Sequence, residues 1–146
     1  METTPSCPEC KAVWRDGITC QDHFYQMLFW ENENPALGEV HHLMVLSYHL
    51  QHPSLYSPDG LKVSMGLLDD FLVKGLSTKQ VRKRNRDVVD SGNRSWKIKA
   101  RPDSHGSYDA PVTWTMTAAD VVANGAEGYI DSVRSWAESI RKSLNR

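Results

Sequence analysis

The chain has 146 residues, of which 40% are hydrophobic and 24% charged, and its formal net charge is -1. This length predicts a single domain, 1–146, that can bury a hydrophobic core without disulfides. The near-zero charge gives no overall field for nucleic acid or membranes, and no apolar run approaches the ~20 residues of a membrane span. No basic region followed by an apolar stretch opens the sequence, so we expect no signal peptide and a cytoplasmic location.

All three cysteines lie in the N-terminal segment 1–24, where Cys7-Pro8-Glu9-Cys10 forms a C-x-x-C pair and Cys20 follows. An odd number of cysteines without a secretion signal argues against a disulfide framework. A thioredoxin-like redox pair would need a preceding strand, and the polar neighbours Pro8 and Glu9 argue against simple burial of both thiols. Two thiolates at this spacing chelate one ion, as in structural zinc sites, and Cys20 offers a third. We therefore predict a metal-binding loop that holds zinc, with iron as the alternative.

Helical spacing of apolar residues predicts helices throughout 20–92, at about 20–33, 37–51, 61–73 and 77–92. Thr19 is placed to cap the first of them, and Asn34-Pro35 ends it. Pro53 stops the second. The fourth is expected from a capping box that pairs Ser77 with Gln80.

The last third of the chain changes character twice. Over 93–116, apolar and polar residues alternate between prolines and glycines, which predicts a short hairpin or an extended loop. Over 117–146 the helical pattern returns, with a cap at Thr117 and apolar residues three and four apart from Ala126 to Leu144. The prediction is a mainly helical domain of about five helices, a small β-hairpin or extended segment, and an N-terminal Cys-rich loop.

The fourth metal ligand is sought among the histidines. A short turn between the first two helices makes them antiparallel neighbours, so Cys20 at the start of one lies near His49 and His52 at the end of the other. This favours His52 and a Cys3His site. His23 is the local rival, because Cys20-x-x-His23 also has a chelating spacing. His49 is a weaker alternative.

The same antiparallel arrangement brings Glu31 close to His41 at the turn end. A carboxylate that fixes an imidazole is one ingredient of general base catalysis. It is also an ordinary tertiary hydrogen bond, which is the interpretation we favour.

Several short motifs together carry a family resemblance. They are Cys7-Pro8-Glu9-Cys10, Cys20, Glu31 before Pro35, Val40-His41, Tyr48, Gln51-His52-Pro53, Thr117-Ala118-Ala119-Asp120-Val121 and Trp136-Ala137. As a set they resemble a bacterial family without assigned activity, domain of unknown function family 5946. The resemblance implies a bacterial protein and favours His52 and His41, since the family pattern has no histidine at the positions of His23 and His49.

The chain also departs from that pattern. His42 stands where the family often has an arginine after the first histidine, and Leu46 and Ser47 stand where an acid often precedes the tyrosine. If that acid served chemistry, this chain lacks it. The family has no assigned activity, so the resemblance supplies a pattern and not a function.

A basic segment gives a rival hypothesis. The segment from Lys79 to Arg101 contains nine basic and two acidic residues, so its net charge is +7. A phosphate-binding surface would be formed by Arg82, Arg86, Arg94 and Lys97. Trp96 could stack on a base. The alternative, which we favour, is a solvated helix face that balances the acidic first half of the chain. No helix-turn-helix, RRM or zinc-finger pattern supports nucleic-acid binding.

The sequence contains no phosphate-binding glycine loop, no G-x-S-x-G and no H-E-x-x-H. We expect a binding or adaptor module with a structural zinc site, whose partner is another protein or a second copy. An enzyme with an open zinc position is the alternative, and it is not favoured.

Overall fold

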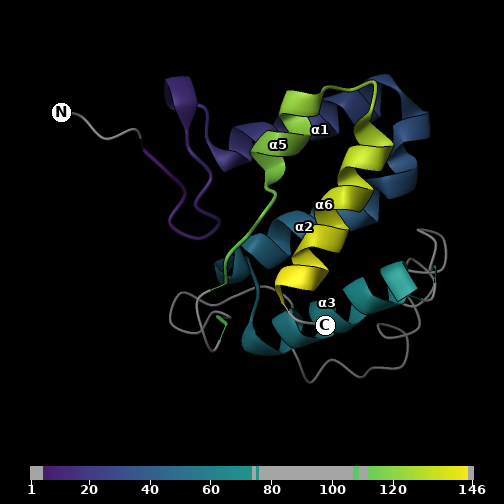
Figure 1. Ribbon diagram of the computed structural model, residues 1–146. Helices are drawn as coiled ribbons and strands as arrows, with labels where there is room; N and C mark the ends of the chain where they lie inside the picture. Colours follow the sequence, from purple (N-terminus) through teal and green to yellow (C-terminus); the bar gives the residue numbers. More distant parts are fainter. Residues whose placement is uncertain (1–4, 74, 76–106, 109–111, 145–146) are drawn as a thin grey trace.

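Two helices, α2 (His41–Gln51) and α6 (Tyr129–Ser143), pack against each other at the centre of the fold. The computed structural model describes residues 5–73, 75, 107–108 and 112–144, with the side chain of Arg15 excepted. On one side α1 (Cys20–Glu33) packs against α5 (Ala118–Asn124), and α5 also contacts α6. On the other side α3 (Pro58–Val73) contacts both central helices (Figure 1).

The mainly helical prediction is confirmed. The described residues contain five α-helices and three short 3-10 helices, η1 (Arg15–Gly17), η2 (Pro35–Val40) and η3 (Pro53–Leu55). No strand occurs among them, and Ser6 and Val13 form an isolated antiparallel bridge. No helix in the described ranges is long and apolar enough to cross a membrane.

Two predictions fall wholly or largely outside the described residues. They are the helix over 77–92 and the hairpin or extended loop over 93–116. Of the latter, the described positions 107–108 and 112–116 form neither helix nor strand.

The connection between α1 and α2 differs from the predicted short turn. Pro35 opens η2, and the Asn34 side chain caps it by accepting a hydrogen bond from the Ala36 N–H at 3.3 Å. The α-helix therefore begins only at His41 and not near residue 37. Side chains of the two helices still meet, because the rings of Phe24 and Tyr48 lie 4.6 Å apart.

Two other helix starts also differ from prediction. Helix α3 begins at Pro58 and not near Leu61, because proline is well tolerated in a first turn and the Ser57 hydroxyl accepts a hydrogen bond from the Gly60 N–H. Helix α6 begins at Tyr129, with Gly128 at its N-cap, so Ala126, the first residue of the predicted apolar pattern, precedes the helix.

The core is built around the apolar stripe of α6. Five of its side chains are buried: Tyr129, Val133, Trp136, Ala137 and Ile140. These residues recur at spacings of three and four, which match the period of an α-helix. One face of α6 therefore meets α2 and α3, and charged residues cover the opposite face.

A buried polar network fixes the end of α2. Gln51 is fully buried, and its side chain accepts a hydrogen bond from the Trp136 indole at 3.1 Å and donates one to the Met116 carbonyl at 2.6 Å. These bonds tie the C-terminal end of α2 to α6 and to the segment before α5. The residue that follows, His52, therefore leaves the helix from a fixed position.

Candidate metal centre

The N-terminal loop turns tightly around the C-x-x-C pair. The Cys7 N–H donates to the Ala12 carbonyl at 2.9 Å, and the Lys11 N–H donates to the Cys7 carbonyl at 3.0 Å. The Cys10 N–H also points at the Cys7 sulfur, 3.4 Å away. This arrangement turns both sulfurs to one side of the loop, the first half of a chelating site.

Cys20 is presented by the first turn of α1. Thr19 caps that turn in a capping box, in which its hydroxyl accepts the Asp22 N–H and its own N–H donates to the Asp22 carboxylate. The Cys20 sulfur lies 3.5 Å from that of Cys10 and accepts a hydrogen bond from the Trp14 indole at 3.3 Å. The helix cap therefore fixes the third thiol beside the loop.

His52 approaches the thiols from the C-terminal end of α2. Its Nδ1 lies 2.6 Å from the Tyr48 carbonyl oxygen, and the imidazole contacts the Tyr48 ring, with ring centroids 4.3 Å apart and an interplanar angle of 30°. A carbonyl can only accept, so Nδ1 carries the proton and, in the neutral ring, Nε2 carries the lone pair. This backbone hydrogen bond is the usual device that orients a metal-binding histidine.

The four side chains form one buried cluster. Both loop thiols are buried, contrary to the expectation from Pro8 and Glu9. With Cys20 and His52, also buried, they place their ligand atoms within 4.8 Å of one another. The Cys10–Cys20 separation of 3.5 Å is close to the ~3.8 Å edge of a tetrahedron with metal–sulfur bonds of about 2.3 Å. Nε2 of His52 is buried and makes no hydrogen bond within the described part of the chain. A buried polar atom without a partner is costly, and a metal ion would satisfy it.

The thiols and the imidazole of the cluster shift one another's pKa values. Hydrogen bonds with Cys10 and Cys20 lower the pKa of Cys7, whereas hydrogen bonds with Cys20 and Cys7 raise the pKa of Cys10. Burial acts to lower the pKa of His52, but the Cys20 and Cys7 sulfurs and the Tyr48 carbonyl together raise it to about 10. Burial itself acts to raise the pKa of both loop thiols, so the cluster resists full ionisation on its own. Several thiolates together would require a bound cation.

One contact that the sequence reasoning missed anchors the loop. The Glu9 carboxylate, between the two loop cysteines, accepts a hydrogen bond from the Ser54 N–H at 3.0 Å. It reaches the first turn of η3, directly after His52. The supporting roles of Trp14 and the Tyr48 carbonyl were missed as well. Only Tyr48 left a sequence signal, its position one helical turn before His52.

The rival histidines lie outside the cluster. His23 sits half-buried on α1, and His49 packs its ring against Phe24 and Tyr56. Neither belongs to the group of side chains that can hold one ion in the described structure.

Glu31 and His41 meet at the other end of α2. The Glu31 carboxylate lies 2.6 Å from His41 Nδ1 and also accepts a hydrogen bond from the Tyr129 hydroxyl. Glu31 is buried, so the three side chains join α1, α2 and α6 through one carboxylate. The candidate anion-binding residues Arg82, Arg86, Arg94 and Lys97 lie outside the described residues.

Fold and site together define a class: a small helical protein whose N-terminal loop and first two helices converge on a buried Cys3His cluster that can hold a metal ion. The chain belongs to a family of unknown function, DUF5946, which it matches over residues 5–145. No curated protein and no solved structure shows significant similarity to it.

Proposed function

We propose that the protein binds one zinc ion through Cys7, Cys10, Cys20 and His52, and that this ion is structural. The observation that carries the proposal is the buried Nε2 of His52, which lacks a hydrogen bond among the described residues and sits with three buried thiols. Four protein ligands complete the tetrahedral coordination typical of structural zinc. Iron is the alternative metal, since thiolates bind both.

The arrangement supports a fastening role. The loop around Cys7 and Cys10 belongs to no helix, whereas Cys20 begins α1 and His52 follows α2. An ion held by all four would cross-link the loop to two helices. Its binding free energy would then become folding free energy. We propose that the domain so stabilised acts as a binding or adaptor module for a protein partner or a second copy.

An enzyme would need an open coordination position. The four residues are buried, and four protein donor atoms would fill a tetrahedral coordination sphere, which would leave no position for a reacting water. This favours the structural role over metal-dependent catalysis.

Cobalt substitution tests the proposal. Chelator-treated protein titrated with Co²⁺ should take up one ion per chain and develop thiolate charge-transfer bands with the strong d–d absorption of a tetrahedral site. Added azide should leave the spectrum unchanged. No uptake would refute metal binding, and a spectrum that shifts with azide would refute the closed site and favour the enzyme.

A further inference from the structure

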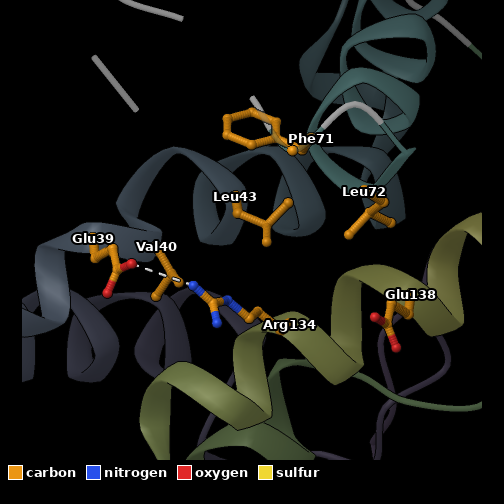
Figure 2. Close-up of a pocket in the computed structure, with 8 residues that line it drawn as sticks. Glu39, Val40, Leu43, Phe71, Leu72, Arg134 and Glu138 are labelled. Atoms are coloured by element: carbon orange, nitrogen blue, oxygen red, sulfur yellow. Dashed lines mark hydrogen bonds and ion pairs between the residues drawn. The ribbon is translucent and has the colours of Figure 1, made fainter. Parts of the chain in front are cut away.

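A cavity of about 340 Å³ lies between η2, the start of α2, the end of α3 and α6 (Figure 2). Its lining includes Val40 and Leu43, at the other end of α2 from His52. With ~1.5 Å of rise per helical residue, the eleven residues of α2 separate the two sites by about 16 Å. The cavity is therefore a different site from the metal centre.

The lining combines an apolar surface with a few charges. Val40 and Leu43 are buried and Phe71 and Leu72 are half-buried, and in Figure 2 their side chains surround the same space. Sites for small molecules are concave, largely apolar and carry few polar groups, and this volume is at the small end of their range. It suits a molecule with one ring and a short chain.

The charged side chains that line the cavity indicate the sign of the charge that its ligand carries. Arg134 already donates to Glu39, with 3.3 Å between Nη2 and Oε1. Glu138 lies one helical turn further along α6, is exposed, and makes no hydrogen bond or ion pair with any described residue. An anion would have to draw Arg134 away from Glu39 and would then face two carboxylates. A cation leaves that pair intact and gains an interaction with Glu138.

We propose that this cavity binds a small amphipathic organic cation, an arylalkyl or alkyl amine. Its apolar part lies against Leu43, Phe71 and Leu72, and its ammonium group lies beside Glu138. The proposal gives the binding module a ligand class and does not depend on the metal.

The test compares three probes of one shape: 2-phenylethylamine, neutral 2-phenylethanol and anionic 3-phenylpropionate. Titration of the full chain at low salt, followed by NMR chemical shifts, should show the amine binding about three- to fivefold more tightly than the alcohol, with the propionate weakest. Shifts should appear at Leu43, Leu72 and α6. Binding of the propionate equal to that of the amine, or no binding of any probe, would overturn the proposal.

Three variants sharpen the result. E138Q should reduce amine affinity to that of the alcohol and leave the alcohol unchanged, whereas E127Q, at an exposed carboxylate before α6, should change neither. E39Q should improve binding of the propionate, because it releases Arg134. Amine affinity unaffected by E138Q would refute the ammonium position. Metal content should be the same in every variant, which separates this outcome from any failure at the Cys3His site.

Discussion

At the scale of single residues, hydrogen bonds orient the side chains of the candidate metal site. The Tyr48 carbonyl fixes the tautomer and direction of His52, and the Trp14 indole donates to the Cys20 sulfur. Such outer contacts commonly change metal affinity by about 10–100-fold when they are removed. The change in metal affinity when such a contact is removed therefore tests whether the cluster binds metal.

Glu9 offers the first test at this scale. Glu9→Ala removes the acceptor for the Ser54 N–H. We expect the variant to bind zinc in the absence of chelator but to release it to a chelator about tenfold faster than the parent. Chelator-competition kinetics measure this rate. Glu33→Ala, at the exposed end of α1, is the matched control and should release zinc at the parent rate. Equal rates in the two variants would show that the loop anchor has no part in holding the metal.

Tyr129 tests the buried carboxylate. Tyr129→Phe removes the hydroxyl that donates to Glu31, and losing a hydrogen bond to a charged group should lower the free energy of unfolding by about 1.5–3 kcal/mol. Urea denaturation gives the value. Tyr25→Phe loses a hydrogen bond from Gln21 on the surface and should change stability by less than about 0.5 kcal/mol. Similar losses in both variants would contradict a special role for the Glu31 contact.

At the scale of elements, helix ends position two of the candidate ligands. Cys20 is the first residue of α1, and His52 is the residue after α2. The positions of Cys20 and His52 were partly predictable from the sequence. Thr19 and Asp22 are a recognisable helix cap, and an antiparallel pair of helices brings the start of the first helix close to the end of the second. The structure of η2 was not, because Pro35 and the Asn34 cap favour a 3-10 helix over an earlier α-helical start.

The two capping boxes form a matched pair. Thr19→Ala in α1 and Thr117→Ala in α5 should each destabilise the fold by about 1 kcal/mol, since each removes the same kind of cap. Only Thr19→Ala should also weaken zinc binding, because only that cap adjoins a ligand. Thermal denaturation and zinc-competition titration, run on both variants, measure the two effects. A Thr117→Ala variant that lost as much zinc affinity would refute local positioning by the α1 cap.

At the scale of the whole molecule, the packing of helices determines contacts between residues that lie far apart in the sequence. The C-x-x-C spacing and the helix pairing predicted the group Cys7, Cys10, Cys20 and His52 that the fold brings together. Neither could reveal Tyr129 as a partner of Glu31, since 98 positions separate them and only the packing of α6 joins them. Glu9 escaped notice for the same reason: its partner, Ser54, becomes a neighbour only after the loop docks.

We propose that Cys7, Cys10, Cys20 and His52 hold one zinc ion that fastens the N-terminal loop to the helices. Metal content per chain tests this proposal most directly, measured by mass spectrometry on untagged protein purified without chelator. The parent and His23→Ala should each carry one zinc, because His23 lies outside the cluster. His52→Ala should lose the metal and melt at a lower temperature. A parent without metal, or a His52→Ala variant that keeps its zinc, would contradict the account.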